Sequence, residues 1–160
     1  MNSESSIAGQ ALSWARVDFA PRHRQPSAAA VVVATVASLA GSLAADAIVV
    51  AIGTAIFPST KGYVHFRFGD YSKLTIIGVL IACLAWPVVT RISSAPRWLF
   101  FRLAVVVTVV LLAPDAWLLL RGASSKAVLV LVIMHLAIAV VTYNCLVHLA
   151  RVRKPRRARA

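Results

Sequence analysis

The sequence predicts an all-α fold: a polytopic membrane protein built as a four-transmembrane-helix bundle, with both termini cytoplasmic. Hydrophobic residues make up 60% of the 160-residue chain and charged residues only 14%, whereas soluble domains have about 25% charged residues. The apolar residues fall into four blocks, at 28–57, 74–90, 98–120 and 127–150. Each block is near or above the length of about 17–25 residues that crosses a bilayer. Four such blocks leave too little polar surface for a soluble fold.

Residues 1–27 precede the first block and are polar with isolated apolar side chains. We expect a disordered cytoplasmic tail here, as is common at chain termini. An amphipathic turn around Leu12–Phe19, carrying Trp14, is the alternative. The first block is too long for the apolar core of a cleaved signal peptide, which spans about 7–15 residues. We therefore interpret it as an uncleaved signal anchor.

One face of the first block carries small and polar side chains. Ala34, Ser38, Ser42 and Asp46 recur at steps of four residues, a spacing that places them on the same side of a helix. Small residues at this spacing let helix backbones approach closely in lipid, where packing drives association. We therefore expect this helix to be central in the bundle.

Segment 58–73 is the longest predicted connection and is expected on the outer side of the membrane. Its aromatic residues, among them Tyr63 and Tyr71, are typical of the interfacial belt of membrane proteins. A binding lip is the alternative, since loops on rigid scaffolds often carry function. In the second block, Pro87 removes one backbone hydrogen bond and predicts a kink.

Three ionisable side chains fall inside the apolar blocks: Asp46 in the first, Asp115 in the third and His135 in the fourth. At the helical rise of about 1.5 Å per residue, all three lie in the outer half of the bilayer. A short connection joins the third and fourth blocks, so these helices are expected to be antiparallel neighbours, with Asp115 facing His135. Together with Ser42 and Thr108, the three residues form a candidate intramembrane polar cluster.

The distribution of basic residues predicts the orientation. Of the 17 Lys and Arg residues, five fall in segments expected outside, namely Lys61, Arg67, Lys73, Arg121 and Lys126. The others cluster around the two termini and around the connection between the second and third blocks. The positive-inside rule therefore places both termini in the cytoplasm and the protein in the cell membrane.

The last ten residues, 151–160, form a basic cytoplasmic tail. We expect this tail to contact the headgroups of anionic inner-leaflet lipids. Its basic residues are Arg151, Arg153, Lys154, Arg156, Arg157 and Arg159.

A faint internal repeat relates residues 43–53 to residues 112–122. Leu, Ala, Asp, Ala and Gly match in register at an offset of 69 residues. A true duplication would make the two halves parallel repeats, as in some transporters. Chance similarity in an Ala- and Leu-rich chain is the alternative.

Several functional classes are disfavoured. Cys83 and Cys145 form no C-x-x-C pair, which argues against a thiol oxidoreductase, and no Cys or His spacing is typical of a zinc site. The basic residues are dispersed around the spans, so nucleic-acid binding is not expected. We expect no metal and no cofactor.

Two short motifs carry a family resemblance. Pro114–Asp115 late in the third span and Met134–His135 early in the fourth resemble small four-helix membrane proteins of actinobacteria, a domain-of-unknown-function family. The resemblance covers about residues 28–150. It implies a membrane bundle but brings no activity or ligand with it.

These observations leave two functional hypotheses open. The first is a non-enzymatic accessory or assembly partner in the cell envelope, bound to another protein or to copies of itself, with an architectural Asp/His cluster. The second is a small proton-coupled transporter or channel-like protomer using Asp115, His135 and Asp46. An intramembrane enzyme has the least support, because the chain has no metal-ligand set and no nucleophile–base pair beyond the His and Asp.

Overall fold

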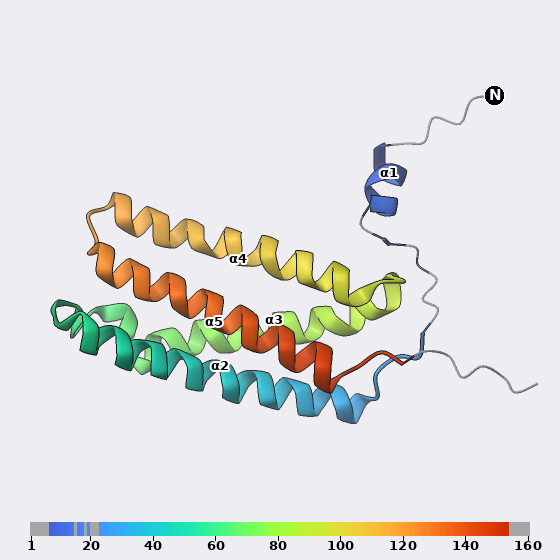
Figure 1. Ribbon diagram of the computed structural model, residues 1–160, viewed down its shortest axis with the longest axis horizontal. Helices are drawn as coiled ribbons and strands as arrows, with labels where there is room; N and C mark the ends of the chain where they lie inside the picture. The colour runs from blue at the N-terminus through green and yellow to red at the C-terminus, as the bar shows by residue number, and fades with distance from the viewer. Residues whose placement is uncertain (1–6, 15, 18, 20–22, 154–160) are drawn as a thin grey trace, which may run out of the picture.

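The computed structural model describes residues 7–14, 16, 17, 19 and 23–153. Its body is formed by four long helices (Figure 1), namely α2 (Ala28–Ile56), α3 (Phe68–Ile92), α4 (Pro96–Leu120) and α5 (Ser125–Leu149). All four are long and apolar enough to cross a membrane. No strand occurs among the described residues. The all-α architecture with four candidate spans is therefore confirmed.

Shorter elements complete the chain. A short helix, α1 (Ile7–Trp14), precedes the bundle, and two 3-10 turns, η1 (Pro58–Thr60) and η2 (Val64–Phe66), connect α2 to α3. The loop that these turns form lies at one end of the bundle, and the described parts of both terminal segments lie at the other (Figure 1). The connections from α3 to α4 and from α4 to α5 are short, so successive helices run antiparallel.

Helix α5 occupies the middle of the bundle. It contacts α2, α3 and α4, and α2 and α4 lie on either side of it (Figure 1). The first span, expected to be central, instead packs against α5 and α3. Its small-residue face nonetheless makes this contact as the spacing predicts, because the buried residues of α2 are Ala34, Ser38, Ser42, Asp46 and Gly53.

The contact between α2 and α5 leaves no room for a side chain at Gly53. A Cβ built on Gly53 would lie 2.6 Å from Cγ2 and 2.9 Å from Cγ1 of Val130 on α5. A branched side chain cannot rotate both methyl groups away, so the backbones approach this closely only because position 53 has no side chain.

Helix α3 begins at Phe68 and continues through Pro87. Its C-terminal end is held by Trp86, which is fully buried and whose Nε1 donates a hydrogen bond of 2.9 Å to the carbonyl of Ala150, just beyond α5. The Trp86 ring also packs edge-on against Phe100 of α4, with ring centroids 5.1 Å apart. Three helices are thus joined at the end of the bundle that carries the termini.

Helix α4 packs least. Its buried residues are Pro96, Leu99 and Phe100 at its start and Asp115 near its end. The residues from 101 to 114 are exposed or half-buried. Asp115 is therefore the buried point at which the second half of α4 is held against the rest of the bundle.

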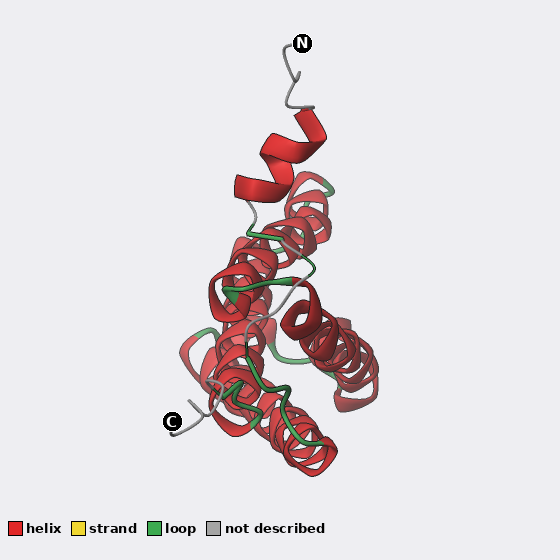
Figure 2. Cartoon of the chain, turned by 90° about the vertical axis from the view of Figure 1, so that its right-hand side faces the viewer, coloured by secondary structure: helices red, strands yellow, loops and turns green. Residues whose placement is uncertain are grey.

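The sequence predicts disorder for the N-terminal segment. In the structure, its described part contacts the start of α4 and the end of α3 through a few side chains. Helix α1 stands off the bundle (Figures 1 and 2), and its Trp14 stacks with the guanidinium of Arg102, which is sandwiched between Trp14 and Trp98 at 4.1 and 3.7 Å from the ring centroids. Further along, Gln25 exchanges two hydrogen bonds with Thr90 of α3. The prediction of disorder rests on local composition, which does not reveal contacts with residues that are distant in the sequence.

Candidate functional site

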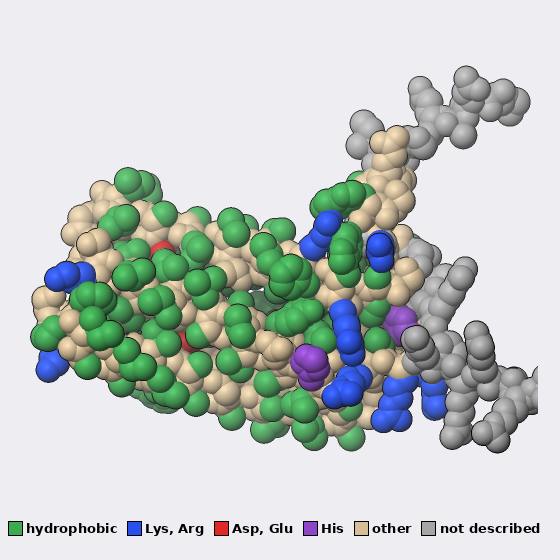
Figure 3. All heavy atoms as spheres, in the orientation of Figure 1, with side chains coloured by type: hydrophobic (Ala, Val, Ile, Leu, Met, Phe, Trp, Pro, Cys, Tyr) green, Lys and Arg blue, Asp and Glu red, His purple; other side chains and the backbone are tan. Residues whose placement is uncertain are grey.

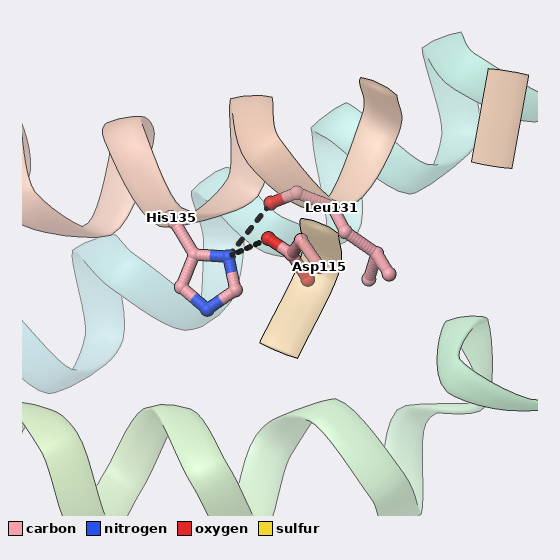
Figure 4. Close-up of polar contacts among 3 residues, drawn as sticks. All are labelled: Asp115, Leu131 and His135. Atoms are coloured by element: carbon pink, nitrogen blue, oxygen red, sulfur yellow. Dashed lines mark hydrogen bonds and ion pairs between the residues drawn. The ribbon is translucent and has the colours of Figure 1, made fainter. Parts of the chain in front are cut away.

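Asp115 on α4 faces His135 on α5 (Figure 4). Nδ1 of His135 lies 3.1 Å from Oδ2 of Asp115 and 3.0 Å from the carbonyl oxygen of Leu131. A carbonyl oxygen can only accept, so Nδ1 carries a hydrogen and donates it to Leu131. Oδ2 of Asp115 has no hydrogen bond of its own among the described residues. The Asp115–His135 contact is therefore mainly electrostatic, and it is strongest when the imidazole is also protonated on Nε2.

Asp46 on α2 faces a different helix. It is fully buried, and its Oδ2 accepts a hydrogen bond of 2.6 Å from Oγ1 of Thr75 on α3. Its second oxygen, Oδ1, is buried and has no hydrogen-bond partner in the described part of the chain. The carboxyl group thus ties α2 to α3 at a point that excludes solvent.

The two contacts belong to one cluster. His135 contacts Asp115 directly and also acts electrostatically on Asp46, so the three groups that the sequence places at similar depth are electrostatically coupled. The charge of Asp115 also acts on Tyr63 in the loop between α2 and α3. The pKa of the Tyr63 phenol is raised above its ordinary value, mainly because the phenol is partly buried and secondly because Asp115 is negatively charged.

The two pairs have related positions. Asp46 on α2 contacts the next helix, α3, and Asp115 on α4 contacts the next helix, α5. Each helical hairpin therefore has one buried Asp on its first helix, facing a polar side chain on its second. The second members do not follow the offset of 69 residues, because position 75 would correspond to Asn144 rather than to His135.

The other two candidate residues have separate partners. The Ser42 hydroxyl lies 3.3 Å from that of Thr142 on α5, one turn of α2 away from Asp46, and joins α2 to α5. The Thr108 hydroxyl donates to the carbonyl of Ala104 on its own helix, at 2.7 Å. Thr108 thus satisfies its hydroxyl locally, and within the described part of the chain it does not bond to the rest of the cluster.

Thr75 and Thr142 are members of the cluster that sequence reasoning missed. A threonine in an apolar helix gives a weak signal, because its hydroxyl can bond to its own backbone, as that of Thr108 does. One signal was available for Thr75: it precedes Val79 and Cys83 at steps of four, and all three are buried. That stripe marks the packed face of α3.

The expected lipid contacts are only partly described. Arg151 and Arg153 are exposed at the end of α5, and Nε of Arg151 donates to the carbonyl of His148 at 2.7 Å. The remaining four, Lys154, Arg156, Arg157 and Arg159, lie outside the described residues.

The groups of the cluster are suited to proton exchange and to fixing helices against one another. Asp115 is 4% exposed and Asp46 is not exposed at all, so neither carboxyl group has room for a substrate. Within the described residues, no three His, Cys, Asp or Glu side chains are grouped so as to hold a metal ion. His135 is more accessible than the two carboxyl groups, with 27% of its side chain exposed.

Comparisons with known proteins give one match. Residues 19–153 match a family model described as a family of unknown function, DUF6069. No curated protein and no solved structure matches the chain. The family match includes all four long helices and every residue of the polar cluster, so the chain belongs to the DUF6069 family of unknown function.

Proposed function

We propose that this protein is a non-enzymatic accessory or assembly partner in the cell envelope, and that its intramembrane Asp/His cluster is architectural. The observation that carries the proposal is the pairing of the polar groups across helix interfaces. Asp46 is closed against Thr75 and Asp115 against His135, in places where a substrate has no access. Polar contacts between membrane helices contribute about 0.6 kcal/mol each on average, so their main effect is to fix helix register.

The exposure of α4 supports the same proposal. Between Phe100 and Asp115 this helix buries none of its residues, and its exposed side chains there are mostly Val and Leu. Such a face has the composition of a surface that contacts lipid or another membrane helix. A subunit that binds a partner needs a face of this kind, whereas a self-contained transporter encloses its pathway.

Purification from native membranes tests the proposal. The tagged chain, extracted in a mild detergent, is expected to carry one other membrane protein in a fixed ratio, measured by quantitative mass spectrometry. A variant with Val106 and Val110 replaced by Trp enlarges two exposed side chains of α4 and is expected to lose that protein. The matched control enlarges Ile77 and Ile81, which are exposed on α3. A monodisperse native chain without any partner contradicts the accessory role.

A second candidate is the small proton-coupled transporter or channel-like protomer. It is favoured by one observation, the partly exposed imidazole of His135, which contacts the Asp115 carboxyl group and acts electrostatically on that of Asp46. This function predicts a proton flux in liposomes containing the native chain, measured with a pH-sensitive dye. Asp115→Asn is then expected to abolish the flux in a protein that still folds. Liposomes without flux above the empty control rule out this candidate.

A further inference from the structure

The end of the bundle next to the termini carries an open pocket that the polar cluster does not use. The pocket has a volume of about 770 Å³ and lies between residues 24–30 and residues 148–153. Helix α2 begins at Ala28 and α5 ends at Leu149, so the pocket lies where these two spans leave the membrane. This is the level of the lipid headgroups.

The walls of the pocket are held by specific contacts. Arg24 and Arg153 form an antiparallel backbone bridge, in which the N–H of Arg24 donates to Arg153 at 2.8 Å and the N–H of Arg153 donates back at 3.2 Å. The neighbouring Gln25 is fixed to Thr90 of α3 by hydrogen bonds of 2.7 and 2.9 Å. The described parts of the two terminal segments therefore meet in a defined arrangement.

The charge of the pocket is uncompensated. Arg24, Arg151 and Arg153 line it, and the described acidic residues, Asp46, Asp70 and Asp115, lie in the half of the bundle away from it. Figure 3 shows Lys, Arg and His side chains gathered at this end, beyond the apolar band that covers the spans. Like charges confined in one pocket repel each other unless an anion binds between them.

The donors suit a phosphate group in particular. Guanidinium groups form paired hydrogen bonds with phosphate oxygens. The N-terminus of α2 also opens onto the pocket: Ser27 caps this helix by accepting from the N–H of Ala30, and both residues line the pocket. The first amides of a long helix carry a partial positive charge that adds to the attraction for an anion.

We propose that this pocket binds the phosphate headgroup of an anionic phospholipid, held by Arg24, Arg151 and Arg153. The apolar side chains that share the lining, Pro26, Leu149 and Val152, contact the glycerol and the upper acyl carbons. The apolar part of the lining and the position at the membrane surface favour a lipid over free phosphate. The proposal goes beyond the accessory role and does not depend on it.

Lipid retention tests the proposal. The full chain is reconstituted in nanodiscs of phosphatidylcholine and phosphatidylglycerol, extracted, and its co-purified lipids are quantified by mass spectrometry. The variant Arg24→Gln/Arg153→Gln replaces two charged guanidinium groups of the pocket with neutral amides and keeps the backbone bridge. Since each charge-assisted hydrogen bond is a strong one, this variant is expected to retain about tenfold less phosphatidylglycerol than the native chain.

The matched control is Arg91→Gln/Arg97→Gln. It removes two exposed charges from the same end of the bundle, at residues outside the pocket lining, and is expected to retain as much phosphatidylglycerol as the native chain. Circular dichroism and size-exclusion chromatography check that each variant folds. Arg151→Gln, which leaves the Arg24–Arg153 bridge untouched, serves as a second pocket variant and is also expected to lose lipid.

The outcomes separate the alternatives. Equal losses in the pocket variant and in the control show diffuse charge attraction and overturn the proposal, as does full retention in both pocket variants. Inorganic phosphate is added to lipid-free protein in detergent as a separate arm. If phosphate raises the melting temperature of the native chain, but not of the pocket variant, while no lipid is enriched, the site takes free phosphate and the lipid assignment is wrong.

Discussion

At the scale of single residues, the most informative feature is a carboxyl group in an apolar helix. An ionised Asp near the middle of a span is costly, by about 2.5–3.5 kcal/mol on insertion scales. Asp115 is tolerated because the imidazole of His135 lies 3.1 Å away, and Asp46 because Thr75 donates to it. Each carboxyl group therefore depends on one neighbour from another helix, which makes these contacts sensitive to single substitutions.

We predict that Asp115→Asn destabilises the bundle by about 1–2 kcal/mol, the upper range for polar contacts between membrane helices. The reason is the loss of the electrostatic contact with His135 at the only buried residue in the second half of α4. Thermal melting in detergent measures the effect. Thr108→Val on the same helix is the control and is expected to be neutral, because its hydroxyl bonds only to Ala104.

A double-mutant cycle makes this prediction specific to the pair. Asp115→Asn and His135→Gln are expected to be non-additive, since either substitution alone already removes the contact. Additive effects, or a melting temperature of Asp115→Asn equal to that of Thr108→Val, would mean that the contact does not hold α4.

At the scale of elements, the helices are joined by two kinds of contact. The α2–α5 interface uses small residues along one stripe of α2 and leaves no room for a Cβ at Gly53. The α4–α5 interface is anchored at the start of α4 and again at Asp115. Packing of small side chains needs no directional partner, whereas the α4 contact depends on two polar groups, so the two interfaces respond to different substitutions.

We predict that Gly53→Ala destabilises the α2–α5 interface by about 1–3 kcal/mol, as overpacking typically does. The new Cβ would meet both methyl groups of Val130, at 2.6 and 2.9 Å. Melting of the purified protein in detergent measures the change, and Gly53→Ala/Val130→Ala is expected to recover part of the loss. Gly78→Ala on α3, where a Cβ meets nothing within 4 Å, is the control. Equal melting of Gly53→Ala and Gly78→Ala would contradict the close approach.

At the scale of the whole molecule, the chain has two chemically different ends. The described parts of both terminal segments lie at one end, with the arginine-lined pocket, and the η1–η2 loop lies at the other (Figure 1). The buried Asp and His residues are in the half nearer the loop. This polarity links the predicted cytoplasmic position of the termini to the proposed headgroup site, because anionic lipids give the cytoplasmic leaflet its negative surface potential.

Single cysteines test the orientation. Ser59→Cys in η1 and Ser94→Cys between α3 and α4 both replace exposed residues at opposite ends of the bundle. With cytoplasmic termini, a membrane-impermeant maleimide is expected to label Ser59→Cys in intact cells and Ser94→Cys only after permeabilisation. The native chain, whose Cys83 and Cys145 lie within the spans, measures the background. Reversed labelling means the opposite orientation, and labelling of both from one side contradicts a four-span bundle.

The sequence by itself determined the class of the protein and the residues worth examining. Apolar block length is a local property, so the four helices could be predicted, and the four-residue spacing of Ala34, Ser38, Ser42 and Asp46 identified the packed face of α2. The short connection between α4 and α5 was enough to pair Asp115 with His135. These inferences succeed because helix periodicity and chain connectivity leave few alternatives.

Only the tertiary structure decided which partners the remaining polar groups have. Periodicity does not specify how helices rotate and pack against one another. That packing places Thr75 beside Asp46 and Thr142 beside Ser42. It also makes α5 the helix that contacts the other three long helices. The same holds for the bridge between Arg24 and Arg153. These residues are far apart in the sequence, and their pocket exists only because antiparallel packing brings the start of α2 beside the end of α5.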